Sequence, residues 1–454
     1  CGSALEGVSV NDFNLMFGTN IGPGSASPGY LRPETVQGIF VEFPQFKEYA
    51  RNQLPFGVAQ IGRAYRNEIS PRRSIIRTRE FTQAELDLFI DPEEDRPDLS
   101  DVEDVTLPLY SAPDQQTDDG GLETMSLTEA VEGGPVESEW VAYYLGIARE
   151  WYERVGLDMD RFRFRQHLSG ERAHYASDCW DAEAEIDGNW IELAGFSYRS
   201  DYDLRKHGEH SGEDFTIFKE YDEPKTVTRA TVDPDMSTLG PEYGSAAGDI
   251  AAELEALAER DPEAFEGEDV TVEVDGEGYD VPLDVTNFRM EERTENGEHI
   301  TPHVVEPSFG VDRLVYAILH HGYREDEVDG EERVYLELDP KVSPTTVAVF
   351  PLMDREGMDE YAEDLEAELR SAGFTTEYDD SGAIGRRYRR QDEVGTPFCI
   401  TVDHRTLEDD TVTVRERDST EQRRIPVNEL SGVLRELRDT GRSFGDFSEY
   451  ELVE

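Results

Sequence analysis

Between Phe56 and Ile90 the sequence contains Tyr65-Arg66-Asn67-Glu68-Ile69-Ser70-Pro71-Arg72 and, shortly after it, Arg77-Thr78-Arg79-Glu80-Phe81-Thr82-Gln83-Ala84-Glu85. Residues 57–68 and 78–90 have the alternating composition of β-strands, and the Ser70-Pro71 step between them favours a loop over residues 69–77. We therefore predict an antiparallel hairpin whose connection is rich in arginine.

The two faces of the second strand differ in chemistry. In a strand, every second residue lies on the same face. One face, which we expect to be the core side, therefore carries Thr82, Ala84, Leu86, Leu88 and Ile90. The other face carries Arg79, Phe81, Gln83, Glu85 and Asp87, and the first strand adds Arg66 and Glu68. Guanidinium groups beside one stackable ring are typical of a nucleotide site. The alternative is a polar strand face that is merely exposed to solvent.

The chain as a whole is strongly acidic. Its 454 residues include 43 Lys+Arg and 102 Asp+Glu, a net charge of −59, and only five residues are lysine. With 37% apolar residues it is too hydrophobic for a disordered acidic tail. A folded chain of this kind favours a proteome at high salt, where ions screen self-repulsion; the alternative is an ordinary acidic protein from a low-salt organism.

Other classes of protein are excluded by simple features. No apolar stretch is long enough to span a bilayer, and no signal-peptide pattern occurs. Three cysteines (Cys1, Cys179 and Cys399) are too few for a disulfide framework, so we expect a cytoplasmic protein.

Charge is unevenly distributed along the chain. Residues 62–80 contain six arginines and two acids, whereas residues 91–139 contain sixteen acids and one arginine, and a second acidic stretch covers about 249–280. We interpret the acidic stretches as insertions or surface modules. The arginine cluster runs against the composition and predicts an anionic ligand, as does a second group formed by Arg386, Arg387, Arg389 and Arg390.

A second phosphate site is predicted near residue 310. A strand over 303–306 ends at Pro307-Ser308, and Ser308 is the expected N-cap of a helix whose apolar face is Val311, Leu314, Val315 and Ile318. Arg313 then lies in the first turn, beside unpaired N–H groups that favour phosphate. The alternative is an arginine exposed on an amphipathic helix.

A further hairpin turns at Asp187-Gly188-Asn189 and returns along Trp190-Ile191-Glu192-Leu193. Glu192 alternates with apolar neighbours and is our candidate ligand for a phosphate-bound Mg²⁺; a surface glutamate is the alternative.

Beyond the break at 339–344, strands and helices alternate: strand 346–350, helix 359–372, strand 374–378, basic helix 384–394, strand 397–402, a hairpin and a last helix. This pattern predicts a small α/β domain.

These segments resemble the dimeric glycyl-tRNA synthetases. The resemblance is carried by Phe13-Asn14-Leu15-Met16-Phe17, Tyr30-Leu31-Arg32-Pro33-Glu34-Thr35, the hairpin at 66–85 as motif 2, and Glu306-Pro307-Ser308-Phe309-Gly310-Val311-Asp312-Arg313 as motif 3. It implies an α/β (α+β) fold: a class II synthetase antiparallel-sheet catalytic core over 1–340, with acidic insertions at about 92–140 and 210–298. A C-terminal mixed α/β anticodon-binding domain would cover 341–454.

The resemblance also implies the site residues. Arg66 and Arg313 would be catalytic, with Arg66 on the α-phosphate, Glu68 on the adenine amino group, Phe81 stacked on the ring, and Arg77 and Arg313 on the outer phosphates. The ATP site would comprise Arg66, Asn67, Glu68, Ile76, Arg77, Thr78, Arg79, Glu80, Phe81, Glu192, Leu193, Gly310, Val311, Asp312 and Arg313, with Mg²⁺ held through Glu192. The glycine site would comprise Glu34, Phe81, Thr82, Gln83, Ala84, Glu85, Glu306, Pro307, Ser308, Phe309 and Gly310. Arg386, Arg387, Arg389 and Arg390 would bind tRNA.

The implied activity is glycine–tRNA ligase, with ATP, glycine and tRNA(Gly) as partners and a homodimeric assembly. Glycine has no smaller analogue, so selection can work by exclusion and no editing domain is required. One alternative is a noncatalytic, nucleic-acid-binding accessory subunit of the same fold; another is a synthetase for a different amino acid. The joint presence of Arg66, Glu68 and Arg313 argues against the first, and Glu34, Glu85 and Glu306 argue against the second.

Some features depart from the family pattern. Gly195-Phe196-Ser197-Tyr198-Arg199 stands where the family usually has Gly-Ile-Ala-Asp-Arg, and Ser74 stands for a usual Gly. Cys1 resembles the remnant of a zinc knuckle, and a lone thiolate offers no zinc site; His207 and His210 are expected to be solvated. No segment resembles motif 1, which in this family builds the dimer interface. We therefore expect an N-terminally incomplete chain, and we predict the homodimer for the intact enzyme only, with assembly of the present chain left open.

Overall fold

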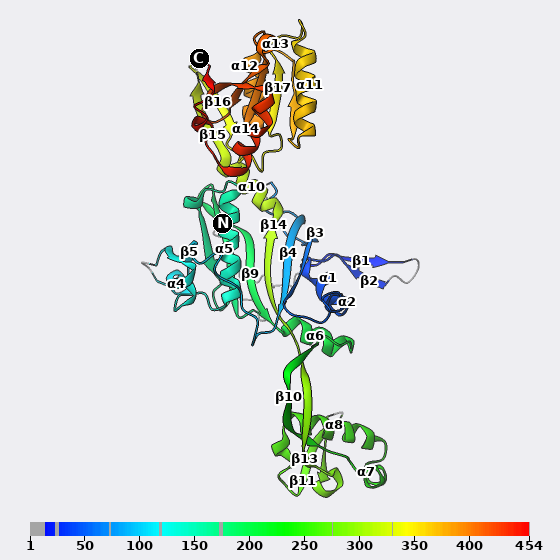
Figure 1. Ribbon diagram of the computed structural model, residues 1–454. Helices are drawn as coiled ribbons and strands as arrows, with labels where there is room; N and C mark the ends of the chain where they lie inside the picture. The colour runs from blue at the N-terminus through cyan, green and yellow to red at the C-terminus, as the bar shows by residue number, and fades with distance from the viewer. Residues whose placement is uncertain are drawn as a thin grey trace, which may run out of the picture. The chain divides into compact units, whose positions relative to one another are not determined.

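The computed structural model describes residues 14–22, 27–71, 74–117, 120–171, 176–274, 276–328 and 330–453. The chain forms two compact units (Figure 1). The second consists of Lys47–Gln53 and Asp214–Thr301, and the first of the remainder. We describe each unit by itself.

The first unit contains an eight-stranded sheet in the order β3-β4-β14-β9-β8-β7-β5-β6. Neighbouring strands are antiparallel except β5 and β7, which are parallel, so the predicted antiparallel-sheet core is confirmed. The strands are β3 Phe56–Tyr65, β4 Glu80–Ile90, β14 His303–Gly310, β9 Asn189–Ser200, β8 Asp178–Ile186, β7 Phe162–Gln166, β5 Thr106–Tyr110 and β6 Glu123–Ser126.

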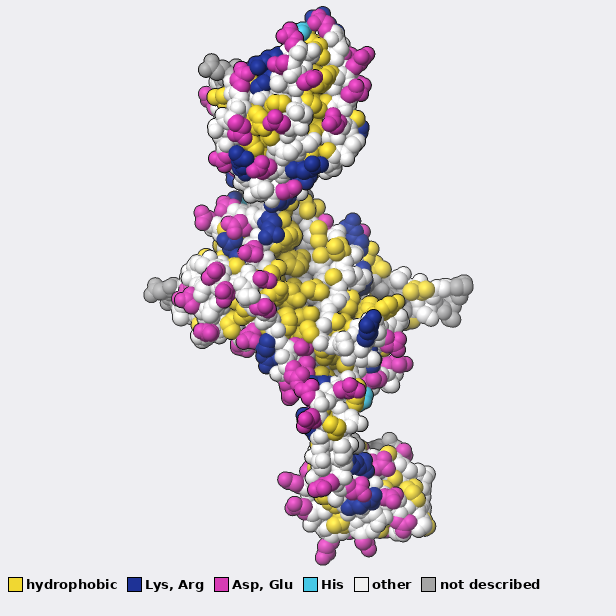
Figure 2. Space-filling view, viewed as in Figure 1, with side chains coloured by type: hydrophobic (Ala, Val, Ile, Leu, Met, Phe, Trp, Pro, Cys, Tyr) yellow, Lys and Arg dark blue, Asp and Glu magenta, His cyan; other side chains and the backbone are white. Residues whose placement is uncertain are grey.

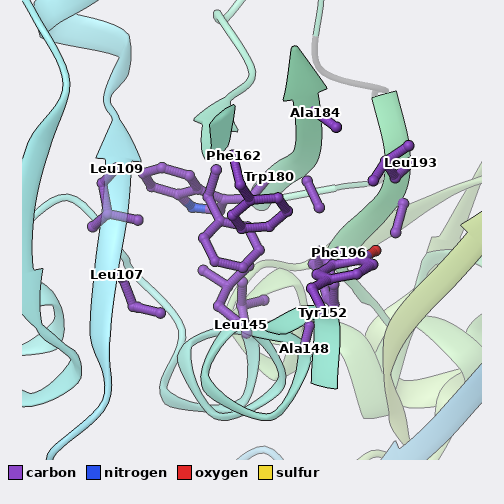
Figure 3. Close-up of a cluster of buried hydrophobic side chains, with 14 of the residues drawn as sticks. Leu107, Leu109, Leu145, Ala148, Tyr152, Phe162, Trp180, Ala184, Leu193 and Phe196 are labelled. Atoms are coloured by element: carbon purple, nitrogen blue, oxygen red, sulfur yellow. The ribbon is translucent and has the colours of Figure 1, made fainter. Parts of the chain in front are cut away.

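The core of this unit lies between one face of the sheet and helix α5 (Glu139–Arg154). Figure 3 shows Phe162 and Trp180 from the sheet above Leu145, Ala148 and Tyr152 of the helix. Helix α10 (Val311–Gly322) adds Leu314 and Ala317 to the same cluster. Burying several large side chains at roughly 1.5–3 kcal/mol each makes this face the main source of stability and leaves the opposite face for a site.

The acidic stretch at 91–139 is not the solvated surface module that we expected. Leu107 and Leu109 of β5 and Leu127 of α4 (Leu127–Val131) are buried in the main core. The acids occupy the loops and the exposed positions, so the charge count of the stretch hides a pattern of buried leucines. Whether the segment is an insertion relative to the family stays a prediction.

The hairpin β3–β4 forms as predicted, with Tyr65 opposite Glu80 and Phe56 opposite Phe89. The prediction of its buried face was wrong. Gln83, Glu85 and Asp87 are 7%, 3% and 0% exposed, whereas Leu86 and Leu88 on the other face are only half-buried. Periodicity separates the two faces of a strand, but the neighbouring elements decide which face is covered. Here helix α1 (Val36–Val41) packs against β4.

The strand–helix junction near 310 also differs from the prediction. Strand β14 continues to Gly310, which occupies the N-cap position of α10, so Ser308 is not the cap. Val315 is 45% exposed, and the buried positions of the helix are Leu314, Ala317, His321 and Gly322. The helix begins later than expected, and the elements packed on it bury a face centred on Leu314, Ala317 and His321 instead of the predicted one.

The C-terminal part has the predicted mixed α/β fold. Its sheet has the order β18-β17-β19-β20-β21-β22, with β17 parallel to β18 and β19 and the other pairs antiparallel. The elements are β17 Val347–Pro351, α11 Met358–Ser371, β18 Thr376–Tyr378, α12 Ile384–Val394, β19 Phe398–Val402, α13 Thr406–Asp409, β20 Thr411–Glu416, β21 Gln422–Pro426, α14 Val427–Thr440 and β22 Glu451–Leu452.

A hairpin of β15 (Tyr323–Val328) and β16 (Glu331–Leu336) precedes this part and packs on α12. The fully buried Arg333 lies 3.4 Å from the Asp392 carboxylate and donates to the backbone oxygen of Arg417 at 2.6 Å. By its contacts the hairpin therefore belongs with the C-terminal part, although in the sequence it comes before the predicted domain boundary. That boundary, at 340–341, stays a prediction.

The second unit is a two-stranded ribbon, β10 (Ile217–Thr231) with β13 (Arg289–Ile300), joined to a small core. The core packs Leu239, Ile250 and Leu254 against Val270 and Val281. Its elements are α7 Met236–Tyr243, α8 Ala247–Arg260, β11 Asp269–Val274, β12 Glu277–Pro282 and α9 Leu283–Thr286. Short elements elsewhere are β1 Gly18–Ile21, β2 Ser27–Tyr30, α2 Phe43–Tyr49, α3 Ala112–Gln115 and α6 Tyr202–Ser211.

Candidate active site

A cavity of about 280 Å³ opens on the face of the large sheet that α5 does not cover. The alternation of β9 shows the two faces clearly, because Gly195 and Ser197 line the cavity while Ala194 and Phe196 lie in the core. The cavity brings together both predicted arginine motifs, although Arg66 and Arg313 are far apart in the chain.

Arg66 follows β3 and is held in place by backbone groups. Its amide N–H donates to the carbonyl of Arg79 at 3.0 Å, and its Nε donates to the carbonyl of Pro33 at 3.1 Å. The guanidinium carbon lies 5.4 Å from the centre of the Phe81 ring. No carboxylate among the described residues forms an ion pair with Arg66, so its charge is available to an anionic ligand.

The other arginines of the hairpin are engaged. Arg77 donates from Nε to the Glu68 carboxylate at 2.7 Å, and Arg79 donates to the Glu68 carbonyl at 3.0 Å. These contacts close the loop between the strands. Ser74, which stands for the usual glycine, has φ +52°, a left-handed conformation that glycine adopts without strain. Arg72, Arg73 and Phe13 lie outside the described residues.

Arg313 lies in the first turn of α10 and joins three parts of the site. Its Nε donates to the Ile76 carbonyl at 3.1 Å, and its Nη1 donates to the Glu192 carbonyl at 2.9 Å. The Glu192 carboxylate lies 3.3 Å from the same guanidinium nitrogen and is half-exposed. The neighbouring Asp312 accepts the backbone N–H of Thr82 at 2.5 Å, which ties the helix to β4.

The predicted glycine pocket is partly assembled at the centre of the cavity, where Glu34, Glu306 and Ser308 line the wall. Ser308 Oγ accepts a hydrogen bond of 2.6 Å from Gln83, whose amide also donates to Glu85 at 3.2 Å. Glu85 itself is 3% exposed and lies behind the wall rather than on it. Its second oxygen accepts the hydroxyl of Thr35. Burial raises the pKa of Glu85.

Sequence reasoning missed the role of Arg199. Its register against β14 shifts between Ser200 and Tyr198, so Arg199 is the extra residue of a β-bulge, a device that re-aims a side chain. The guanidinium is 3% exposed, forms two hydrogen bonds of 2.8 and 3.1 Å with Asp203, and pairs with Glu306. Because Arg199 was noted only as part of a departure from the family pattern, its bulge could not be anticipated.

The carboxylates around Arg199 outnumber it. Glu306 lies across from Asp87, which is fully buried and whose two oxygens have no hydrogen-bond partner among the described residues. The pKa of Asp87 is raised well above its usual range, and that of Glu306 is raised to about 8. The main cause is burial, and repulsion by the neighbouring acids adds to it. These raised pKa values mean that the cluster holds protons at neutral pH and becomes a stronger partner for a cation as the pH rises.

The far wall of the cavity was also missed. It is lined by His167, Glu171, Cys179 and Asp181 together with Ser197. Cys179, Asp181 and Glu183 alternate along β8 and share the face of the site, so the period-two test applied to β4 would have found them. Ile75 and Gly195 complete the lining residues that were not predicted.

The structure separates the remaining predicted residues into two groups. Besides Arg66, Arg313, Glu34, Glu192, Glu306 and Ser308, the residues that line the cavity are Glu68, Ile76, Arg77, Thr78, Phe81, Thr82, Gln83, Leu193, Gly310 and Asp312. The residues that do not line it are Asn67, Arg79, Glu80, Ala84, Glu85, Val311, Pro307 and Phe309. Phe309 packs against the core cluster on the other face.

The basic helix α12 presents fewer free arginines than its sequence suggested. Arg387 is 4% exposed and donates to the carbonyls of Pro351 and Asp380, so it is structural and its assignment to tRNA is corrected. Arg390 pairs with Asp379, Arg389 lies 3.8 Å from Asp392, and Arg386 is exposed.

No group of three or more metal-ligating side chains occurs within the described residues, and Cys1 lies outside them. No helix among the described residues is long and apolar enough to cross a membrane.

Comparisons with known proteins agree with this architecture. A model of the tRNA synthetase class II core domain (G, H, P, S and T) matches residues 27–322, and one of an anticodon binding domain matches residues 346–437. The solved structure of a prolyl-tRNA synthetase from Cryptosporidium parvum, complexed with L-proline and AMP, superposes with a TM-score of 0.52 at 16% identity, covering 94% of this chain and 64% of the other. At that identity the likeness shows the fold alone.

Curated relatives are much closer in sequence. The glycine–tRNA ligase of Methanothrix thermoacetophila is 47% identical over 98% of this chain and 76% of its own length. That of Archaeoglobus fulgidus is 48% identical over 96% of this chain and 75% of its own length. With the class II core, the anticodon-binding fold and both arginine motifs in one cavity, the chain belongs to the glycine–tRNA ligase family of class II aminoacyl-tRNA synthetases.

Proposed function

We propose that the protein activates glycine with ATP to form glycyl-adenylate and transfers the glycyl group to the 3′ end of tRNA(Gly). The observation that carries the proposal is the convergence of Arg66, Arg313 and Glu306 in one cavity of the family fold. A noncatalytic accessory subunit would have no reason to keep this set. Glycine-dependent exchange of pyrophosphate into ATP, measured in molar KCl, tests the activity; exchange with another amino acid but not with glycine would contradict it.

The proposed first step is in-line attack of the glycine carboxylate on the α-phosphorus of ATP, with pyrophosphate as the leaving group. Arg66 would neutralise charge at the reacting phosphorus, Phe81 would cover the adenine, and Arg77 and Arg313 would hold the outer phosphates. No protein nucleophile is required, because positioning and charge neutralisation supply the rate. Glu68 is paired with Arg77 in this structure, so adenine binding would involve a rearrangement of that contact.

We propose Mg²⁺ as the companion of ATP, with Glu192 as its protein ligand. Its carboxylate is half-exposed on the cavity wall beside Arg313, which fits a metal whose other ligands are phosphate oxygens and water. Bound there, Mg²⁺ would neutralise phosphate charge. Arg313 would share that task by holding Glu192 in position.

The glycine ammonium would lie against Glu34 and Glu306, which leads to a prediction about pH. The pKa of Glu306 is about 8, so below that pH the group is largely protonated and a weaker partner for a cation. We expect kcat/KM for glycine in pyrophosphate exchange to rise between pH 6.5 and 8.5, by up to about tenfold per pH unit below the pKa. A value that stays constant across this range would contradict the assignment.

For tRNA, we propose that the C-terminal domain binds the phosphate backbone through the exposed Arg386, with Arg389 and Arg390 contributing from the same helix. Since aminoacylation supplies protein synthesis, the same proposal places the enzyme in the cytoplasm.

We propose that the intact protein functions as a homodimer and that the face described below contributes to its interface. The face of β3 and β4 opposite the cavity is apolar and open: Ile61 is 75% exposed, and Val315 and Leu319 of α10 are 45% and 41% exposed. Figure 2 shows hydrophobic side chains gathered over the region where Figure 1 draws β4 and β14. Exposed apolar area of this kind is typical of protein interfaces.

The dimer can be tested by mass. Light scattering after size exclusion in molar KCl should give about twice the chain mass of 51.4 kDa, and Ile61→Arg should shift the protein toward the monomer because a charge would be buried at the interface. Val394→Arg is a matched control, since Val394 is 51% exposed on α12. A wild-type monomer at micromolar concentration would contradict the assignment of the interface to this face.

We further propose that the acidic surface is an adaptation to high salt. Acidic side chains are distributed widely over the visible face (Figure 2), and the net charge is −59. Their mutual repulsion is screened over about 3 Å at 1 M salt but over about 10 Å at 0.1 M. We expect the far-UV circular dichroism of the folded state to be lost on dialysis below about 0.5 M KCl, whereas full structure in dilute buffer would refute the proposal.

A further inference from the structure

The floor of the cavity continues past the proposed glycine site. The β-sheet register aligns Ser308 of β14 with Gly195 of β9, and Gly195 with Asp181 of β8. In the next row Ser197 lies opposite Cys179, and the His167 amide donates to the Cys179 carbonyl at 3.0 Å. Neighbouring strands lie about 4.8 Å apart, so Asp181 is roughly 10 Å from Ser308 across the sheet.

Gly195 leaves the route between these two residues open. A Cβ atom at this position would meet only Asp181 Oδ1, at 3.8 Å, so that oxygen lies over the glycine. The other carboxylate oxygen, Oδ2, is 2.8 Å from His167 Nε2. Asp181 therefore has one oxygen held by a partner and one turned over the cavity floor.

His167 is the charged partner of Asp181. The hydrogen bond with Asp181, ahead of the contact with Cys179, raises the pKa of His167 to about 10, so the imidazole is a cation at neutral pH. Burial raises the pKa of Asp181 and opposes the ionised state, and His167 counters that effect. Cys179 Sγ lies 3.2 Å from Ser197 Oγ, which completes a polar wall.

Neither ATP nor glycine uses this wall in the proposed function. The proposal places the adenine with Phe81, the phosphates with Arg66 and Arg313, and the glycine with Glu306 and Ser308, none of which belongs to β7 or β8. The second step requires a hydroxyl of a terminal ribose to reach the glycyl carbonyl. The ATP site uses β3, β4, the start of α10 and Glu192 of β9, so the part of the floor left for the RNA is formed by β7 and β8 together with Gly195 and Ser197 of β9.

Resting on the proposed function, we propose that Asp181 binds the terminal ribose of the acceptor RNA, with Oδ1 accepting the hydrogen bond of the ribose hydroxyl that does not react. His167 is a positioning residue, which acts through Asp181. This site would select an RNA whose terminal ribose carries both hydroxyls, because one hydroxyl reacts while Asp181 binds the other.

Two half-reactions separate this role from activation. Pyrophosphate exchange measures activation alone, and single-turnover transfer of glycine from preformed enzyme-bound adenylate to tRNA measures the second step. We expect Asp181→Asn to lower the rate of transfer by about ten- to a hundredfold, the loss expected for one hydrogen bond to a charged group. The fall in the rate of exchange should be at least about ten times smaller than the fall in the rate of transfer. His167→Asn should show the same imbalance with a smaller loss.

The RNA supplies the second readout. Transcripts ending in 2′-deoxyadenosine or 3′-deoxyadenosine lack one hydroxyl each; the one that lacks the reacting hydroxyl will not be charged, and the other will be charged slowly by the wild type. If Asp181 binds the missing group, Asp181→Asn should slow transfer to that second RNA less than threefold. A purely structural role would slow transfer to the deoxy and the natural RNA by the same factor.

A control is available at the turn between β8 and β9. Asp187 lies 3.0 Å from His320 of α10, neither residue lines the cavity, and the Asp187 side chain is 78% exposed. Asp187→Asn should leave both half-reactions within twofold of wild type. The proposal would be overturned if Asp181→Asn lost exchange and transfer equally. It would also be overturned if the variant slowed transfer to the deoxy RNA by the same factor as transfer to the natural RNA. If the wild-type protein showed no glycine-dependent pyrophosphate exchange, the proposed function itself would be contradicted instead.

Discussion

Replacement of Arg66 by alanine should lower kcat/KM for glycine-dependent pyrophosphate exchange by about 10² to 10³, the range expected when one donor to a developing charge is removed. Arg66 is the arginine of the cavity that has no ion-pair partner among the described residues, while Arg77 and Arg313 are engaged with Glu68 and Glu192. Its contacts with the Pro33 carbonyl and the Phe81 ring hold the guanidinium in place before the substrate arrives.

Two further variants sharpen this prediction. Arg66→Lys keeps the charge but loses the planar pair of N–H donors, so it should recover only part of the lost activity. Arg63→Ala is the matched control, because Arg63 lies on the same strand, is about half-exposed 3.7 Å from Glu80, and does not line the cavity. Exchange by Arg66→Ala within threefold of wild type, with unchanged circular dichroism, would remove the assignment.

The sequence was sufficient for the elements that local patterns specify. The hairpin around Arg66 and Phe81 was predicted within two or three residues at each strand end, and helix 384–394 was predicted with the bounds that α12 has. Gly395, with φ +86°, ends that helix, and such a C-terminal signal is visible in the sequence. The cavity-lining residues of motifs 2 and 3 were predicted because their spacing resembles the family.

The errors arose where burial depends on distant segments. Gln83 and Asp87 looked like exposed polar positions, but the covering helix α1 comes from the residues before the hairpin. Arg387 looked available to phosphate, but the carbonyls of Pro351 and Asp380 occupy it. Arg199 depends on a β-bulge, an irregularity of register that no periodicity reveals.

Asp181 is an error of a different kind, because the information was present. It alternates with Cys179 and Glu183 on β8, but those residues belong to no motif that the family resemblance made conspicuous. The same period-two reading that found the polar face of β4 would have placed Asp181 on the site face of its sheet.

Removal of the Arg199 guanidinium should be the most destabilising single change at the site. Arg199→Met leaves the carboxylates of Glu306 and Asp203 without their buried partner, close to the fully buried Asp87. Breaking a buried ion pair from one side costs about 3–5 kcal/mol in the free energy of unfolding. Urea unfolding in molar KCl at pH 8.5 should show this loss, together with loss of glycine-dependent exchange.

The dependence on pH distinguishes this cause from a simple packing defect. The pKa of Glu306 in the folded wild type, about 8, lies above its ordinary value of 4.5, so its contribution to stability is complete below pH 4.5 and is lost as the pH rises through 8. Without Arg199 the folded-state pKa should rise further, because a favourable charge has gone. The deficit of Arg199→Met should therefore be smaller at pH 5.5 than at pH 8.5.

Arg205→Met provides the comparison on the adjoining helix. Arg205 lies 3.0 Å from Glu209 with both side chains nearly half-exposed, and exposed pairs of this type contribute at most about 1 kcal/mol. Its loss should be small and nearly independent of pH, since no buried carboxylate is left unpaired. If the deficit of Arg199→Met were the same at both pH values, the buried carboxylates could not be its cause, and the guanidinium would act only through its packing over the Phe40 ring, 5.3 Å away.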